Sequence, residues 1–232
     1  MDTPDGSKSQ DRPLTTTSYA VLSVLSLGAH STYDLIRQMR RSMHYMWPRA
    51  ESNVYAEPRR LVEAGLATAR EEWNGQRRRT VYSITERGRT ALARWLASPS
   101  ARQRYESEAL VKILFAENGT PKDMLASIGA LREDASEIIR HFLGIAERYA
   151  ENQGEYPRRF ALSGLAARLV VEQQAATLRW AKWAEQVVAG WDTPAAGEMA
   201  WGVEVLRATG EDFPLDDDPV REVVEGRNPG AA

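Results

Sequence analysis

The chain has 232 residues, 43% of them hydrophobic and 27% charged, which is the composition of a globular protein with room for one large or two small domains. It has no cysteine, which excludes disulfides, thiolate metal sites and cysteine nucleophiles, and its three histidines are too far apart in sequence to predict a zinc or Ser-His-Asp site. The net charge of −2 is unevenly distributed, because residues 12–96 hold 14 arginines, no lysine and 7 acidic residues, giving +7 against −9 for the rest.

This asymmetry predicts that the first part of the chain contacts a polyanion and the second does not. High genomic GC content, which also favours arginine over lysine, would explain the composition equally well. Residues 1–13 are polar and are expected to be disordered, without the apolar core of a signal peptide. No stretch approaches the roughly 20 apolar residues that span a bilayer. We therefore expect a cytoplasmic protein.

Two helices are predicted first. The segment TTTSYAVLSVLSLG, residues 15–28, has hydroxyl capping candidates and an apolar face that ends at Gly28. The segment STYDLIRQMRRSMHYMW, residues 31–47, forms a second helix, which Pro48 stops because the residue before proline is pushed out of the α region. Its predicted inward side chains are Tyr33, Leu35, Ile36, Met39 and Met43.

A third helix is predicted from about Glu51 to Ala64, with Gly65 just past its end. At about 100° per residue, one side of the helical wheel is apolar and the other is polar and basic. The apolar side comprises Val54, Pro58, Leu61 and Val62, and the other side Ser52, Asn53, Ala56, Arg59 and Arg60. Pro58 would cost about 3 kcal/mol in a regular helix interior, so either the helix begins late or it is kinked.

A β-hairpin follows, with strands at residues 66–73 and 76–84 around Asn74-Gly75, the strongest short-range hairpin signal. A two-residue turn there would place Glu72 opposite Arg77, Glu71 opposite Arg78 and Arg70 opposite Arg79. The first two pairs would stabilise the hairpin by up to about 1 kcal/mol. The last pair would need an external anion, which favours Arg79 as a ligand of that anion.

Thr85 then caps a fourth helix, ERGRTALARWLA. Three helices, a two-stranded wing and a fourth helix in about 85 residues predict a winged helix-turn-helix domain over residues 14–98. The rest is predicted to be a helical domain over residues 104–209, followed by a disordered acidic tail over residues 210–232. The predicted fold is therefore mainly α, with an antiparallel helical domain after the winged domain.

The long second predicted helix of that domain carries an apolar stripe over about 30 residues, which is typical of helix pairing within a dimer. A monomeric helical hairpin would give the same stripe. The predicted dimerisation residues are Leu125, Ile128, Leu131, Ile138, Phe142, Ile145, Leu165 and Leu169.

Three motifs resemble the PadR-type transcriptional regulators: TYDLIRQM, SNVYAEPRRLVEAGL and RRRTVYSITERGR. The resemblance covers residues 14–97, and the helical remainder is similar in pattern to the longer dimerisation domain shared with virulence-gene activators. Pro58 departs from the family pattern, which has an aliphatic residue there. The resemblance implies a homodimer that binds a pseudo-palindromic operator in double-stranded DNA, without a cofactor or metal.

The third helix and the wing supply the predicted DNA-binding residues. These are Arg49, Ser52, Asn53, Tyr55, Arg59, Arg60, Asn74, Gly75, Arg77, Arg78 and Arg79. Ser52 and Asn53 could instead be a plain N-cap, and Tyr55 could be a packed aromatic whose hydroxyl alone reaches the surface. An arginine-rich surface can also be simply solvated.

The sequence thus predicts a transcriptional regulator, a repressor released by a small-molecule effector, and not an enzyme. Trp95, Trp180 and Trp183 are candidates for binding a small aromatic effector, although each could serve core packing. Two alternatives remain: an activator of the same fold that acts with a partner protein, and a winged-helix protein-interaction module that does not bind DNA.

Overall fold

A computed structural model describes residues 13–47, 54–75, 77–151, 153, 156–193 and 199–211. The chain divides into two compact units, one formed by the residues up to Tyr105 together with Ala146–Val170, the other by Glu106–Ile145 and the residues from Val171 onward. The ends predicted to be disordered lie almost wholly outside the described residues. The domain boundaries 14–98 and 104–209 stay predictions.

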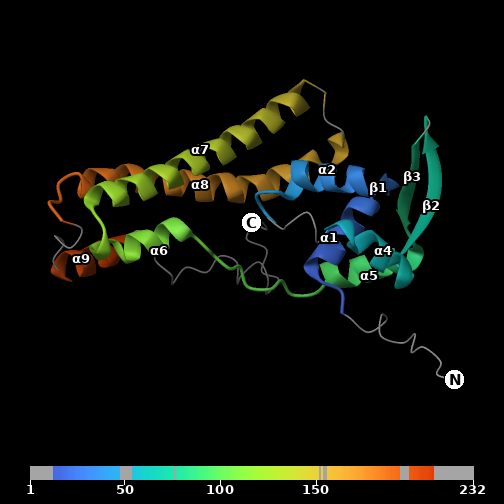
Figure 1. The fold of residues 1–232 in the computed structure, drawn as a ribbon, viewed down its shortest axis with the longest axis horizontal. Coiled ribbons are helices and arrows are strands. Elements are labelled where there is room, and N and C mark those ends of the chain that lie inside the picture. Colours follow the sequence, from blue (N-terminus) through green and yellow to red (C-terminus); the bar gives the residue numbers. More distant parts are fainter. Residues whose placement is uncertain are drawn as a thin grey trace, which may run out of the picture. The chain divides into compact units, whose positions relative to one another are not determined.

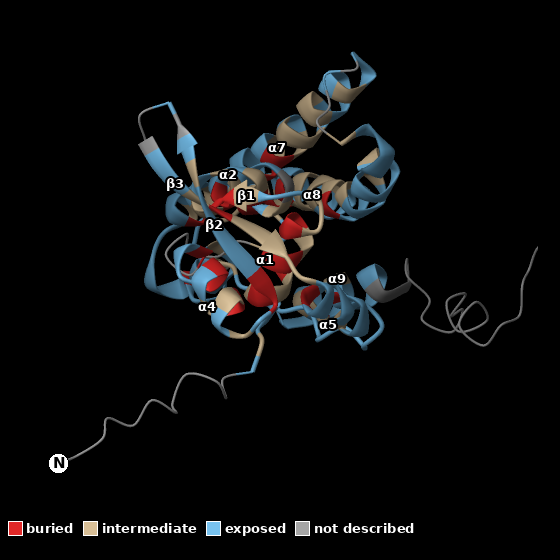
Figure 2. Ribbon diagram, turned by 90° about the vertical axis from the view of Figure 1, so that its right-hand side faces the viewer, coloured by how far each residue is buried: buried red, intermediate tan, exposed pale blue. Residues whose placement is uncertain are grey.

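Four helices of the winged unit are α1 (Thr16–Leu25), α2 (Thr32–Met43), α4 (Glu57–Glu63) and α5 (Glu86–Leu96) (Figure 1). The N-cap of α1 is Thr15, whose side chain forms a capping box with that of Ser18. Its apolar face is buried with Leu35 of α2 and Leu61 of α4 in one core cluster. Figure 2 shows buried positions on α1 and α4 and exposed ones along most of β2. The prediction that Tyr33 faces this core is wrong, because its side chain is largely exposed.

The sheet has three strands in the order β1-β3-β2, where the sequence predicted a two-stranded wing. The additional strand is β1 (His30–Ser31), and the hairpin consists of β2 (Ala67–Asn74) and β3 (Arg77–Ile84). Ser31 pairs with Val81 and also caps α2 by accepting a hydrogen bond from the Asp34 N–H. The wing is therefore joined to the start of α2 through β1. A two-residue strand has no periodicity by which the sequence could reveal it.

The predicted hairpin register is wrong, because the loop begins one residue later in the chain than predicted. Asn74 is the last residue of β2 and pairs with Arg77, and Gly75, which follows Asn74, has a φ of 62°. Each β2 residue therefore faces a partner two positions further along β3 than predicted, so that Glu72 lies opposite Arg79. Because side chains alternate with a period of two, the residues that share a face are unchanged.

Close contacts fix α4, the wing and α5 to one another. Gly65 has a φ of 70° after the end of α4, as predicted, and the Leu66 N–H donates to the Leu61 carbonyl at 2.8 Å. The Thr85 hydroxyl accepts from the Gly88 N–H at 3.0 Å and donates to the Gly65 carbonyl at 2.8 Å. A Cβ at Gly88 would lie 2.1 Å from the Leu66 carbonyl oxygen, so only glycine allows this approach.

The remaining helices are α6 (Glu108–Leu114), α7 (Pro121–Ala150), α8 (Phe160–Val188) and α9 (Met199–Glu211), with 3-10 turns at Ala116–Asn118 and Pro157–Arg159. Helices α7 and α8 run antiparallel (Figure 1). In the second unit, Met124 and Ile128 of α7 share a buried cluster with Ala181, Ala184 and Val188 of α8. The Arg132 and Glu185 side chains form an ion pair at 3.1 Å.

This packing corrects part of the predicted dimer surface. Within the single chain, Ile128 is only 1% and Ile138 only 7% exposed, so neither side chain is available to a partner. The remaining α7 residues of the stripe, Leu125, Leu131, Phe142 and Ile145, are half-buried. Leu165 and Leu169 of α8 are 74% and 60% exposed. The long stripe on α7 is thus largely explained by packing inside one chain, as in a helical hairpin.

Candidate nucleic-acid interface

The geometry of α4 resolves the problem posed by Pro58. The helix begins at Glu57, so Pro58 is its second residue, where the missing N–H has no intrahelical partner to lose. Val54, Pro58 and Leu61 are buried, as the helical wheel predicts. Arg49, Ser52 and Asn53 lie outside the described residues, and their DNA contacts stay predictions.

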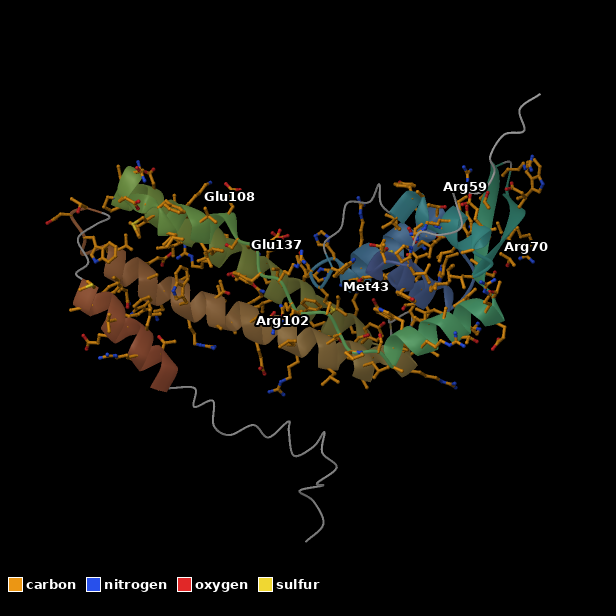
Figure 3. All side chains as sticks on the ribbon, turned by 90° about the horizontal axis from the view of Figure 1, so that it is seen from below. Met43, Arg59, Arg70, Arg102, Glu108 and Glu137 are labelled. Carbon is orange, nitrogen blue, oxygen red and sulfur yellow. The ribbon has the colours of Figure 1, made fainter. Side chains whose placement is uncertain are left out.

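Arg59 and Tyr55 are exposed at the outer side of this segment. The Arg59 side chain makes no hydrogen bond or ion pair with any other residue in the described part of the chain, and it projects from the unit's surface (Figure 3). Tyr55 is 58% exposed, which favours the interpretation of a surface side chain over that of a packed aromatic. An unpaired guanidinium beside an exposed phenol can donate hydrogen bonds to phosphates or base edges.

Arg60, predicted to lie on the same outer side, instead turns inward. Its guanidinium donates to the Pro13 carbonyl at 2.8 Å and lies 3.2 Å from a carboxylate oxygen of Glu57. Glu57 is buried, so its charge requires a nearby cation. The Arg60 charge is therefore used within the fold, where it connects α4 to Pro13, three residues before the start of α1.

Arg79 also has internal partners, contrary to the expectation that it needs an external anion. Its guanidinium lies 3.4 Å from the Glu72 carboxylate and 3.7 Å from that of Asp34 at the start of α2. Arg70, predicted to be similarly unpaired, forms an ion pair with Glu72 on its own strand. The hydrogen bond from Arg70, followed by the effects of Arg79, holds the pKa of Glu72 below its ordinary value. The shifted register produces this network by bringing Arg79 opposite Glu72.

The Asp34 carboxylate links the wing to α2. It accepts a hydrogen bond from the Ser31 hydroxyl at 2.7 Å and forms an ion pair with Arg37 at 3.2 Å. The Ser31 hydrogen bond is the main reason that the pKa of Asp34 is lowered, with smaller contributions from Arg37 and Arg79, while burial opposes the shift. Arg79 thus acts as a bridge between two elements.

Arg70 and Arg78 remain candidates for contact with an anion. The Arg78 guanidinium lies 3.2 Å from the Glu71 carboxylate, so the predicted charge pair forms, but diagonally, because Glu71 lies opposite Thr80 and not opposite Arg78. Exposed ion pairs contribute only about 0–1 kcal/mol, so a phosphate can replace either carboxylate at small cost. The main chain of Gly75 lies at the loop, whereas the side chains of Asn74 and Arg77 lie outside the described part.

Two exposed aromatic residues of this unit are not among the DNA-binding residues predicted from the sequence. Trp73, opposite Arg78 near the end of β2, is 71% exposed, and the ring of Tyr33 lies 6.0 Å from the Arg37 guanidinium carbon. Alternation along β2 places Trp73 on the face shared with Glu71, but no sequence pattern shows that nothing covers that face. Both are surface aromatics adjacent to arginines.

The three candidate effector tryptophans have different surroundings. Trp95 stacks on Tyr19 of α1, with ring centroids 4.8 Å apart, which explains it as packing within the winged unit. Trp180 is half-buried against the cluster between α7 and α8. Trp183 remains 40% exposed and is parallel to Trp201 of α9, a residue that sequence reasoning did not select.

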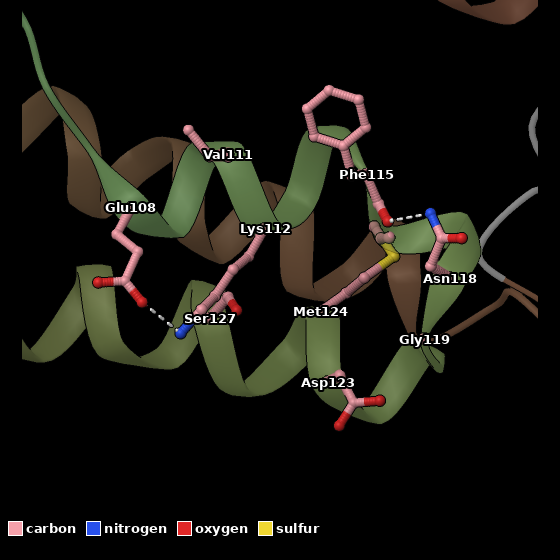
Figure 4. A pocket seen from close by; sticks show the side chains of 10 residues that line it. Glu108, Val111, Lys112, Phe115, Asn118, Gly119, Asp123, Met124 and Ser127 are labelled. Carbon is pink, nitrogen blue, oxygen red and sulfur yellow. Dashed lines mark hydrogen bonds and ion pairs between the residues drawn. The ribbon is translucent and has the colours of Figure 1, made fainter.

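The second unit has a largely apolar hollow of about 420 Å³ beside α6 and the first turns of α7 (Figure 4). Val111, Phe115 and Met124 line it, and the Glu108–Lys112 ion pair, at 2.7 Å, lies at its edge. The Lys112 hydrogen bond lowers the pKa of Glu108. An exposed apolar surface on α6 and the residue after it is formed by Leu110, Val111, Leu114 and Phe115. The second unit thus exposes apolar side chains on α6, whereas the winged unit exposes arginines.

Two regions of the chain are similar to known protein families. Residues 21–94, which include the second half of α1, all of α2, α4 and the wing, and most of α5, match the transcriptional regulator PadR-like family. Over this region, about a third of its length, the chain resembles this family. Residues 106–189 match the C-terminal region of the virulence activator alpha family. The PadR-like family comprises transcriptional regulators rather than enzymes.

Known relatives cover much of the chain. It is 27% identical over 141 residues to a probable transcriptional regulator of Mycobacterium tuberculosis, covering 56% of this chain and 75% of that protein. It is 29% identical over 79 residues to the negative transcriptional regulator PadR of Bacillus subtilis, covering 34% of this PadR-like chain and 43% of that protein, less than half of its length.

Solved structures show the same fold. The Bacillus subtilis PadR structure in complex with operator DNA has a TM-score of 0.66 at 18% identity, covering 76% of this chain and 99% of that one. The Vibrio cholerae virulence activator AphA has a TM-score of 0.57 at 25% identity, covering 75% and 98%. The fold class predicted from the sequence, a mainly α winged helix-turn-helix protein with C-terminal helices, is confirmed.

Two further features of the described residues bear on function. No group of three or more His, Asp or Glu side chains among them could hold a metal ion. None of the described helices combines the length and apolar character needed to cross a membrane.

Proposed function

We propose that this PadR-like regulator is a homodimeric DNA-binding repressor. The exposed Arg59 on α4, with no partner in the described part of the chain, is the observation that carries the proposal most strongly. In a winged helix-turn-helix the helix of this position enters the major groove, and the wing reaches the neighbouring backbone or groove. Binding to chromosomal DNA would require the cytoplasmic location that the sequence predicts.

The two sets of arginines have different proposed roles. Arg59, together with Tyr55, reads or positions the major groove, whereas Arg70 and Arg78 of the wing contact phosphates after giving up exposed ion pairs. Arg60 and Arg79 hold the recognition helix and the wing in place. The structure of Bacillus subtilis PadR with operator DNA supports the general mode.

The proposed dimer uses surface that one chain leaves exposed. Leu162, Leu165 and Leu169 follow one another at helical spacing on α8 and are 60–74% exposed. The exposed apolar side of α6 offers a second area of contact. Burying these side chains against a second copy would stabilise a dimer, whose two winged domains would then read half-sites about one helical turn, roughly 34 Å, apart.

The effector and the sign of regulation are extensions of this proposal. Bacillus subtilis PadR has been solved with p-coumaric acid, which supports an effector of small aromatic type here. The match of residues 106–189 to a virulence activator region favours activation with a partner protein as a second candidate function. The position of the operator relative to the promoter distinguishes a repressor from an activator.

Footprinting on the intergenic DNA beside the gene tests the proposal. We expect a protected pseudo-palindrome and its loss in Arg59→Glu, with protection unchanged in Glu117→Lys, a charge reversal at an exposed position of the other unit. A protein-interaction module that does not bind DNA would give no protected site. Equal protection by wild type and Arg59→Glu would contradict the assigned interface.

A further inference from the structure

Three tryptophans form an aromatic corner in the second unit. Trp183 of α8 and Trp201 of α9 are parallel within 2°, with ring centroids 6.3 Å apart. Trp191, between these helices, lies nearly perpendicular to Trp201, at 77° and 5.6 Å. Two indole planes thus face the same way and a third closes the arrangement from the side.

One ring of this corner packs against the core of the unit, and the other two are partly exposed to solvent. Trp191 packs against the buried cluster that Met124 and Ile128 share with α8, which fixes its position. Trp183 and Trp201 remain 40% and 38% exposed, so much of each indole is open to solvent. Packing of α9 against α8 explains why the rings lie close together, but it does not explain why two such large side chains remain this exposed.

The electrostatics of the unit favour a cation as the occupant. Residues 106–145 and 171–211 hold 13 acidic and 7 basic residues. Asp192 follows Trp191 directly and Glu204 lies one helical turn beyond Trp201, both exposed, with Lys182 and Arg207 as the basic residues nearest in sequence. Indole faces carry negative electrostatic potential and attract organic cations more strongly than other aromatic side chains do.

We propose that Trp183, Trp191 and Trp201 form a binding site for a planar organic cation. Trp183 lies inside the matched family region, whereas Trp191 and Trp201 lie beyond residue 189, where that match ends. The biological role of the site as an effector pocket rests on the ligand-responsive regulator proposed above. Binding itself is independent of DNA and is tested without it.

Calorimetric titration of the full chain compares three probes of similar shape: 1-methylquinolinium, neutral quinoline at pH 8, and 2-naphthoate. We expect the cation to bind once per chain and at least about fivefold more tightly than quinoline, with 2-naphthoate weakest. The absence of binding, equal affinities for the cation and quinoline, or preference for the anion would overturn the proposal.

Variants locate the site. Trp201→Ala should weaken 1-methylquinolinium at least about tenfold and Trp201→Phe by a smaller factor, because phenylalanine keeps an aromatic face with weaker attraction for cations. Leu206→Ala, an exposed change on the same helix, should leave the affinity unchanged. The Phe variant preserves the test if the Ala variant loses helix by circular dichroism. Unchanged affinity in Trp201→Phe and Trp201→Ala would place the probe elsewhere. DNA protection measured separately keeps failure here distinct from failure of the DNA-binding proposal.

Discussion

At the scale of single residues, the nearest carboxylate determines what each arginine does. Arg59 and Arg60 are neighbours on α4, yet only Arg60 is close to Glu57 and the Pro13 carbonyl. The helical wheel places both on the outer side because it describes direction from the helix axis and not the reach of a long side chain. Arg79 likewise lies close to two carboxylates, those of Glu72 and Asp34.

Replacing Arg60 should affect folding more than DNA contact. Arg60→Ala leaves the buried Glu57 carboxylate without its ion-pair partner, so we expect the free energy of unfolding to fall by about 1–3 kcal/mol. Arg59→Ala, the matched control, should change it by less than about 0.5 kcal/mol. Urea titrations followed by circular dichroism measure both, and equal losses would contradict the distinction.

Asp34 should make the wing junction sensitive to acid. Because its pKa is lowered in the folded state, the stabilisation is fully present above its ordinary value of 3.8 and is lost as the pH falls through the lower folded-state value. Asp34→Asn should therefore cost about 1 kcal/mol near pH 6 and progressively less toward pH 3. Urea unfolding at several pH values would show this convergence. A constant difference between the two proteins would mean that the carboxylate charge is unimportant.

At the scale of elements, caps and turns decide where the wing sits. The Thr85 hydroxyl, hydrogen-bonded to main-chain groups of Gly65 and Gly88, joins α4 to α5, and Gly88 approaches the Leu66 carbonyl closely. Such contacts tolerate no added atoms, whereas a glycine inside a long exposed helix has no comparable constraint. The two kinds of glycine in this chain therefore predict opposite effects of the same substitution.

Gly88→Ala should destabilise the winged unit by at least about 1–3 kcal/mol, because its methyl group would overlap the Leu66 carbonyl. Gly129→Ala in α7 has no heavy atom within 4 Å of the new Cβ and should stabilise its helix by about 0.5–1 kcal/mol. Urea unfolding monitored by circular dichroism measures both. Stabilisation by Gly88→Ala would show that α5 does not pack on Leu66 as described.

Local rules predicted much of this element-scale structure. The Thr85 cap, the turn at Gly65 and the buried face of α4 follow from residues adjacent in sequence. The strand register did not, because both a turn at Asn74-Gly75 and one at Gly75-Gln76 satisfy the requirement for glycine. The inward turn of Arg60 depends on Pro13, 47 residues away, and only the folded chain reveals such contacts.

At the scale of the whole molecule, apolar surface divides into two kinds. The stripe on α7 is used mainly inside the chain, since Ile128 is buried against α8. In a single copy, the side chains of Leu162, Leu165 and Leu169 on α8 are 60–74% exposed. Periodicity alone cannot separate these roles, because an intrachain partner and a second copy bury the same pattern of residues.

The double variant Leu165→Glu/Leu169→Glu should dissociate the proposed dimer while keeping the fold, because both side chains are exposed in the single chain. Sedimentation velocity should show monomers at concentrations where the wild type is dimeric. As a contrast, Ile128→Ala should lower the free energy of unfolding by about 2–5 kcal/mol without preferentially causing dissociation. A double variant that remains dimeric would place the interface on another surface.

The salt dependence of binding to the footprinted DNA tests the central claim most directly. For wild type, the logarithm of the association constant should fall steeply and linearly with the logarithm of salt concentration, by about 0.9 for each phosphate contacted. Arg59→Ala should reduce that slope if the Arg59 guanidinium binds a phosphate. If the guanidinium binds a base edge, the variant should instead lower the affinity and the sequence preference. Arg60→Ala should preserve the slope. A flat slope for wild type, or an Arg59→Ala protein with unchanged affinity, slope and sequence preference, would contradict the account.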